Sequence, residues 1–121
     1  MEINLIRYCY SRWGIMGVLF IEGFAVCHSC EHPKYFLSSG KYKLEKEGGE
    51  LRILSTRKKR PTLCAGNGPF SFTDGSIIVG KYLTSGVLVH SQASYTAIFK
   101  RILWYLNKKE SITLTIQDKK S

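Results

Sequence analysis

The hydrophobic pattern of the chain begins with two short apolar segments that a tight turn separates. Residues 15–21 and 24–30 are mainly apolar, and residues 22–23, a Glu-Gly pair, lie between them. Glycine tolerates the positive φ that a two-residue hairpin turn requires. With this turn, Leu19 is predicted to pair with Val26. Because both faces of the hairpin are apolar, we expect it to be central and covered on both sides.

A second hairpin is predicted around a Gly-Gly pair at residues 48–49, joining residues 41–46 to residues 51–55. Its first strand alternates Tyr42 and Leu44 with lysines, which indicates one buried face and one solvated face.

Turn residues dominate the middle of the chain. A Gly-Asn-Gly-Pro loop occupies residues 66–69, and a Thr-Asp-Gly turn occupies residues 73–75. Such residues favour tight turns for reasons of backbone geometry. A short apolar strand is expected to follow at residues 76–79 and to end at Gly80.

The C-terminal third predicts one helix and a final strand. Ser91 is expected to be the N-cap of a helix over about residues 92–107. Large apolar side chains recur along it at helical spacing, which is typical of core packing against a sheet; they are Tyr95, Ile98, Phe99, Ile102, Leu103 and Leu106. Residues 111–117 then alternate apolar and polar side chains and predict a strand.

These elements predict a single domain over residues 1–121, mostly β with one helix (α+β). We expect a compact, mostly antiparallel β-barrel or bent sheet of six to eight strands, with a C-terminal amphipathic helix followed by a final strand. The 121 residues are about one domain's worth. A chain of this length needs neither a metal nor disulfides to fold.

The charge is strongly positive, because 18 Lys and Arg stand against 9 Asp and Glu. Such an excess favours contact with phosphate, anionic lipid or acidic polymers. The densest basic run, and the candidate binding loop, is Arg57, Lys58, Lys59 and Arg60. No aromatic residues are interleaved with it in the manner of RNA-binding modules. Nucleic acid is therefore an alternative partner rather than the favoured one.

No targeting or membrane-spanning segment is predicted. Residues 1–10 carry Glu2 and Arg7 and lack the apolar stretch of a signal peptide. The longest apolar run, residues 15–21, is too short to cross a bilayer. We expect a cytoplasmic protein, with export by a route that reads no N-terminal signal as an open alternative.

Cys27 and Cys30 form a Cys-x-x-Cys motif, with His32 close behind. Redox and zinc sites both use this spacing. In an extended strand, however, residues three apart point to opposite faces. No second ligand pair lies at a standard zinc spacing. We therefore predict buried, inert cysteines, no metal site and no cofactor.

A candidate reactive group lies around the two central turns. Cys64 precedes the first turn and Ser76 follows the second, and Asn67 and Glu31 complete the set of candidate catalytic residues. A nucleophile needs a base within hydrogen-bond reach, usually a histidine. The three histidines lie outside both turns, so two ordinary turns remain the simpler interpretation.

Several short motifs follow one another between Gly14 and Phe99. They read Gly17-Val18-Leu19-Phe20, Cys27-His28-Ser29-Cys30-Glu31, Leu37-Ser38-Ser39-Gly40-Lys41-Tyr42, Cys64-Ala65-Gly66-Asn67 and Phe72-Thr73-Asp74-Gly75-Ser76-Ile77-Ile78-Val79-Gly80, before the helix that Ser91 opens. In order and spacing they resemble an uncharacterised bacterial and phage family of unknown function, with His-x-Gly-Asn and Asp-Thr-x-Gly-Cys motifs.

The departures from the family pattern carry the functional prediction. Cys64 stands at the histidine position, Ser76 at the cysteine position and Phe72 at the position of the aspartate. A His and Cys pair of this kind is similar to that of cell-wall L,D-transpeptidases, in which histidine deprotonates the cysteine nucleophile. The resemblance implies a member without this chemistry: a non-catalytic binding or structural module, in a phage-like or secretion-associated setting. Its partner would be an unknown protein or a cell-wall polymer.

Two other function classes stay open. One is a cell-wall acyl-transfer or hydrolytic enzyme that uses Cys64 or Ser76, with His28 or His90 within hydrogen-bond reach. The other is a polyanion or nucleic-acid binder that uses residues 57–60, whose affinity would fall steeply with salt.

Overall fold

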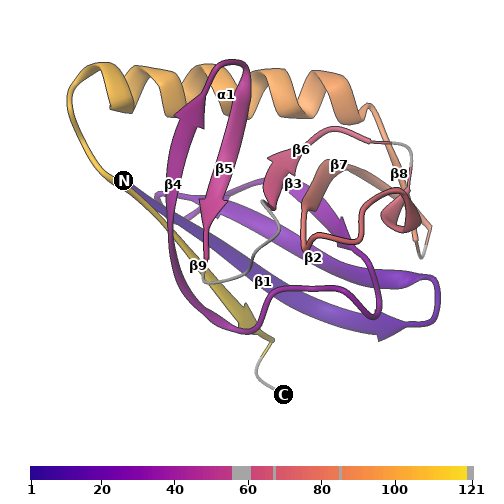
Figure 1. Cartoon of the computed structure of the whole chain (residues 1–121). Coiled ribbons are helices and arrows are strands. Elements are labelled where there is room, and N and C mark those ends of the chain that lie inside the picture. The colour runs from indigo at the N-terminus through magenta and orange to yellow at the C-terminus, as the bar shows by residue number, and fades with distance from the viewer. Residues whose placement is uncertain (56–60, 67, 85, 120–121) are drawn as a thin grey trace.

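The fold is described from a computed structural model, which defines residues 1–55, 61–66, 68–84 and 86–119. Figure 1 shows the elements in space. In chain order they are β1 (Glu2–Ser11), β2 (Gly14–Ile21), β3 (Phe24–Glu31), β4 (Gly40–Glu47), β5 (Glu50–Leu54), β6 (Thr62–Cys64), the 3₁₀ turn η1 (Pro69–Ser71), β7 (Ile77–Thr84), β8 (Val87–Val89), α1 (Ser91–Asn107) and β9 (Ile112–Asp118).

Eight strands form a closed barrel. Their order is β3-β2-β1-β9-β4-β5-β6-β7, and the barrel closes because β7 also pairs with β3. The pairings β1–β9 and β6–β7 are parallel, and the other pairings around the barrel are antiparallel. The structure thus confirms the predicted mostly β barrel with one helix followed by a final strand.

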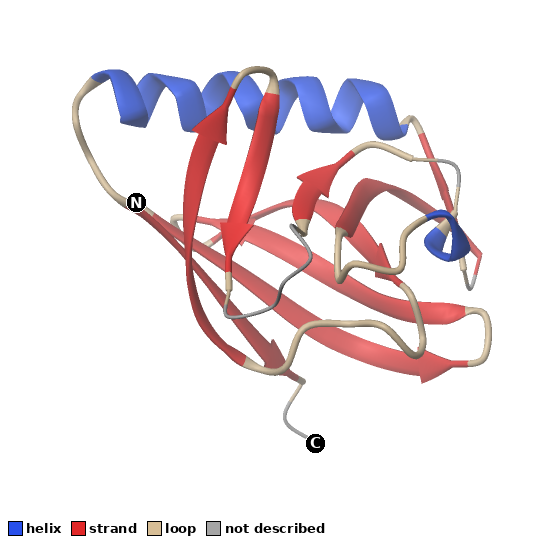
Figure 2. Ribbon diagram, in the orientation of Figure 1, coloured by secondary structure: helices blue, strands red, loops and turns tan. Residues whose placement is uncertain are grey.

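The helix α1 lies across one end of the barrel (Figures 1 and 2). Ile98 and Ile102 are buried, and Tyr95, Phe99 and Leu106 pack partly against the same core. This confirms that the apolar stripe is a packing surface. The β4–β5 hairpin reaches the helix as well, since the Tyr95 hydroxyl donates to the Gly49 carbonyl oxygen at 2.8 Å.

The start of α1 differs from the prediction. The N-cap is His90, in a left-handed conformation with φ 52°, and no side chain caps the helix. The Ser91 hydroxyl instead donates to the Val79 carbonyl oxygen at 2.6 Å and accepts a hydrogen bond from the Gly66 amide at 3.0 Å. Ser91 therefore ties the helix to β7 and to the loop after β6.

The first hairpin forms as predicted at its turn, where Ile21 pairs with Phe24. Beyond the turn the expected register is wrong: Leu19 pairs with Cys27 rather than Val26, because one extra residue forms a β-bulge in β3. As a result, Val26 and Cys27 both pack against the core. The hairpin was also expected to be covered on both faces. Its outer face is not fully covered, since Phe20 stays partly exposed.

The described residues contain nine strands, one more than the expected upper limit. The pattern did not reveal β1, β6 or β8. The expected end of a strand at Gly80 is wrong too, because β7 continues to Thr84. Glycine is needed at this position: a Cβ on Gly80 would lie 2.9 Å from the Cβ of Leu88. The two paired strands β7 and β8 therefore approach each other closely at Gly80.

The second hairpin and the last strand confirm the simple alternation patterns. β4 and β5 flank Gly48 and Gly49, and Leu44 points into the core. Ile112, Leu114 and Ile116 of β9 are buried at alternate positions. Within the described ranges, no helix has both the length and the apolar character that crossing a bilayer demands.

Candidate functional site

The parallel strands β6 and β7 bring Cys64 and Ser76 to one face of the barrel wall. Leu63 pairs with Ile77, and both side chains are fully buried in the core. Cys64 and Ser76, each one residue away from this pair, point to the outer face because side chains alternate along a strand. The structure thus places Cys64 and Ser76 on the same face of β6 and β7.

Thr62 lies between these two side chains. Its hydroxyl is 3.4 Å from the Ser76 hydroxyl oxygen and also hydrogen-bonds the Cys64 thiol. Sequence reasoning did not identify Thr62. The signal that could have done so is its position two residues before Cys64, on the same face of a strand.

The hydroxyl of Ser76 has a structural hydrogen bond. It accepts from the Thr62 amide at 2.9 Å, and the Ser76 amide donates to Asp74 Oδ1 at 2.9 Å. Ser76 itself is only 3% exposed. The side chain therefore joins the start of β6 to the turn before β7, and no base contacts its oxygen among the described residues.

The thiol of Cys64 is partly buried and not activated. Burial raises its pKa to about 11; the Thr62 hydrogen bond opposes this shift, and the negative charge of Asp74 adds to it. At neutral pH only about one molecule in ten thousand would carry the thiolate, since each unit of pKa is a factor of ten. A nucleophilic cysteine requires the opposite shift.

The histidines have other surroundings. His28 lies between Tyr8 and Tyr82, with ring centroids 6.2 and 5.7 Å away. His32 accepts from the Lys34 amide at 3.0 Å and the Tyr35 amide at 3.2 Å.

His90 precedes Ser91 at the start of α1 and lines a pocket there, beside Lys81 of β7. In the part of the chain that the structure describes, none of the three histidines hydrogen-bonds Cys64 or Ser76. The geometry therefore offers neither residue a histidine base.

Glu31 lies on the inner side of the barrel wall. Its carboxylate accepts from Arg7 Nε at 2.9 Å and from Arg7 Nη2 at 2.6 Å. Arg7 Nη2 also donates to the Leu37 carbonyl oxygen at 2.6 Å. Burial raises the pKa of Glu31, and the bonds from Arg7 oppose that shift. The structure does not bring Glu31 together with Cys64 and Ser76.

Sequence reasoning also missed Arg7, the partner of Glu31. The available signal was its alternation with Ile3 and Leu5, which places a cation on the buried face of β1. A buried charge in such a position is normally paired.

The remaining candidate residues cannot be placed. Asn67 and the basic run Arg57, Lys58, Lys59 and Arg60 lie outside the described residues. Their predicted roles stay predictions.

The cysteines of the Cys-x-x-Cys motif point to opposite faces, as expected for a strand. Cys27 packs against the core, whereas Cys30 belongs to the outer face with its strand partner Ile78. Burial raises the pKa of each thiol to about 12. All four cysteines are free, and no group of three or more potential metal ligands occurs within the described segments.

The loop between β6 and β7 folds over the site. Gly66 lies against the ring of Phe72 and the side chain of Ile78. Gly75, directly before Ser76, has a φ of 92°, which glycine adopts without strain. Among the described residues, these contacts pack around Cys64 and Ser76 and bring no histidine to either side chain.

Comparisons of this chain with models of protein families, with curated proteins and with solved structures found no match.

Proposed function

We propose that this chain is a non-catalytic binding or structural module of the bacterial and phage family that its motifs resemble, acting in a phage-like or secretion-associated setting. One observation carries the proposal. Cys64 and Ser76, the two residues at the reactive positions of the family pattern, lie on the same face of the barrel wall, yet their shared neighbour is the neutral hydroxyl of Thr62 rather than a base.

The local structure supports this proposal in two further ways. The Ser76 hydroxyl accepts a backbone hydrogen bond, so its removal would disturb the strand pairing rather than a reaction. The high pKa of the Cys64 thiol keeps it protonated at neutral pH. Both residues thus have a packing role at the positions where the family pattern has histidine and cysteine.

Turnover assays test the proposal directly. The protein would be incubated with peptidoglycan fragments that contain tetrapeptide stems, and products would be followed by mass spectrometry. We expect no cleavage and no transfer product above the buffer control. Turnover that disappears in Cys64→Ala or Ser76→Ala, with both variants folded, would establish the enzymatic alternative instead.

A further inference from the structure

A pocket of about 370 Å³ opens between the first half of α1 and the neighbouring strands. Its floor includes Ile21 at the end of β2, Val26 of β3 and Ile98 of α1. Pockets that bind small molecules have volumes of about 300–1,000 Å³ and combine apolar walls with a few polar groups. This pocket is at the lower end of that range. This pocket lies apart from Cys64 and Ser76, neither of which lines it.

The sequence explains why this part of the helix leaves the pocket open. Ala93 and Ala97 are one turn apart, have short side chains and line the pocket. Below them, the β-bulge contributes Val26, the unpaired extra residue of β3. Bulges redirect side chains and are frequent beside binding sites.

The fully charged side chains of the pocket are both cationic. Lys81 comes from β7 and Arg101 from α1, one turn after Ala97. The other polar lining residues are His90 and Ser94, and among the described residues no Asp or Glu lines the pocket. Neither cation forms an ion pair within the described segments. Two unpaired cations beside an apolar floor would attract an anion that also carries an apolar part.

We propose that this pocket binds a small amphipathic carboxylate, with its apolar chain over Val26 and Ile98 and its carboxylate between Lys81 and Arg101. The two cations provide charge complementarity, and the alanines provide the space. The inference gives the proposed non-catalytic function a ligand class and so rests on that function. Absence of binding would overturn only the pocket, whereas turnover of a bound ligand would overturn the proposed function.

The direct test is a titration of the full chain with sodium octanoate, followed by ¹H–¹⁵N NMR. We expect saturable shifts at the amides of Val26, Ala93 and Ala97, with a dissociation constant of about 1 mM or tighter, a range typical of ligands of about ten heavy atoms. Octan-1-ol has the same chain without the charge and is expected to bind about tenfold more weakly. Equal binding of the two ligands, or no saturable shift up to about 20 mM octanoate, would overturn the proposal.

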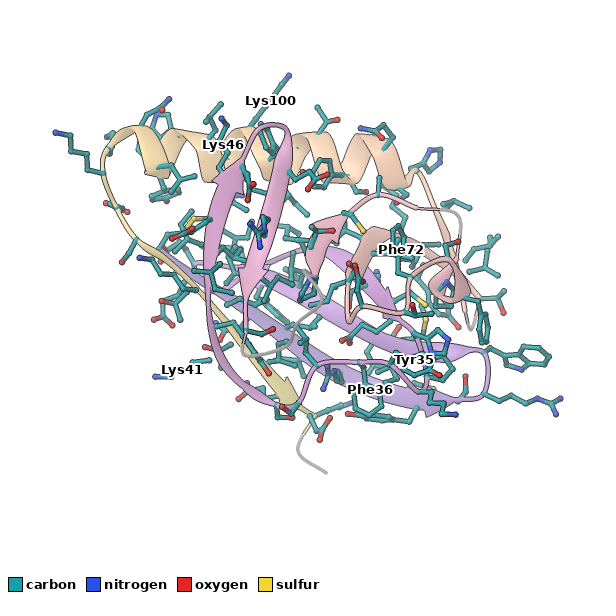
Figure 3. All side chains as sticks on the ribbon, viewed as in Figure 1. Tyr35, Phe36, Lys41, Lys46, Phe72 and Lys100 are labelled. Atoms are coloured by element: carbon teal, nitrogen blue, oxygen red, sulfur yellow. The ribbon has the colours of Figure 1, made fainter. Side chains whose placement is uncertain are left out.

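Three variants locate the site. The first is a double variant in which both exposed cations are replaced, Lys81→Gln with Arg101→Gln. It is expected to weaken octanoate binding about tenfold, because two charge-assisted contacts are lost. Lys100→Gln is the matched control: Lys100 lies on α1 next to Arg101 but points away from the barrel (Figure 3), so its change should leave binding unaltered.

The third variant, Ala97→Leu, places a larger side chain on the wall of the pocket and keeps a good helix former at this position. It is expected to abolish binding while the remaining amide spectrum stays that of the folded protein. Unchanged affinity in both Ala97→Leu and the double glutamine variant would place octanoate elsewhere and overturn the assignment.

Discussion

Arg7 and Glu31 form a two-bond ion pair on the inner face of the barrel, where both residues are 1% exposed. The pair explains why two charges occupy core-facing positions of β1 and β3. It also holds the Glu31 carboxylate on the inner face, whereas Cys64 lies on the outer face. The loop after β3 contributes to the same arrangement: Arg7 donates to the Leu37 carbonyl oxygen, and its guanidinium carbon lies 5.2 Å from the centroid of the Phe36 ring.

The role of this ion pair is testable by removing one charge. Glu31→Gln is expected to lower the free energy of unfolding by about 3–5 kcal/mol, because it leaves the Arg7 guanidinium buried without its counter-charge. Urea unfolding followed by circular dichroism measures the change. The matched control is Glu47→Gln, which removes the exposed partner of Arg52 and should cost less than about 1 kcal/mol. Equal losses in the two variants would show that the buried pair has no special role.

Ser76 is expected to matter for stability. Ser76→Ala leaves the Thr62 amide without its acceptor, which should cost about 1–3 kcal/mol of unfolding free energy. Ser71→Ala, a change of an exposed serine in the same loop, should stay within about 0.5 kcal/mol. If Ser76→Ala proved neutral in urea unfolding, the hydrogen bond to Thr62 would not be the reason for this serine.

The loop over the site predicts a difference between two nearby glycines. In Gly66→Ala, the new Cβ would lie 2.9 Å from Phe72 Cε2 and 3.3 Å from Ile78 Cδ1. We expect a loss of about 1–3 kcal/mol from this overpacking. Gly68→Ala meets nothing within 4 Å and should be neutral or slightly stabilising. Thermal unfolding of both variants distinguishes them, and similar midpoints would contradict the packing.

The buried thiols predict a loss of stability at high pH. Burial raises the pKa of Cys64 to about 11 and that of Cys27 and Cys30 to about 12, from 9.0. The folded state therefore keeps protons that the unfolded state releases, so this contribution is present below about pH 9 and is lost as the pH rises through 11–12.

Urea unfolding at several pH values, with a reductant present, measures this effect. Cys64→Ala is expected to reduce the fall in unfolding free energy between pH 9 and 11 by about 1–3 kcal/mol, because one of the retained protons is gone. The non-titrating change Ser71→Ala should leave the slope as it is. An identical slope in wild type and Cys64→Ala would contradict the raised pKa.

Local patterns predicted the elements whose turn or periodicity is complete within a few residues. The Gly48–Gly49 hairpin, the apolar stripe of α1 and the alternation in β9 are of this kind. The Glu22–Gly23 turn was predicted too, but the bulge at Val26 was not, because an apolar residue fits either face of an apolar hairpin.

Features that depend on distant residues could not be predicted from local pattern. β1 was missed because Arg7 interrupts the apolar alternation that Ile3 and Leu5 begin, and its buried partner Glu31 lies 24 residues further along the chain. The closure of the barrel by β3 and β7 is likewise non-local.

In the candidate site too, local pattern predicted some features, whereas others depend on distant residues. The motif order predicted that Cys64 and Ser76 belong together, and the parallel pairing of β6 and β7 brings them to one face. It also grouped Glu31 with them, which the alternation of β3 prevents. Whether a side chain points into the barrel or away from it depends on the bulge and the register, so it required the structure.

The most direct test of the non-catalytic account is the reactivity of Cys64. The rate of iodoacetamide labelling would be measured from pH 6 to 11.5 and followed residue by residue by mass spectrometry, with the partly buried Cys27 and the buried Cys30 as internal references. The account predicts slow labelling of Cys64 at neutral pH and a rate that rises only toward pH 11, in line with its pKa of about 11. Rapid labelling that titrates below about pH 8.5, the value of a free cysteine, would mean an activated thiol and would contradict the account.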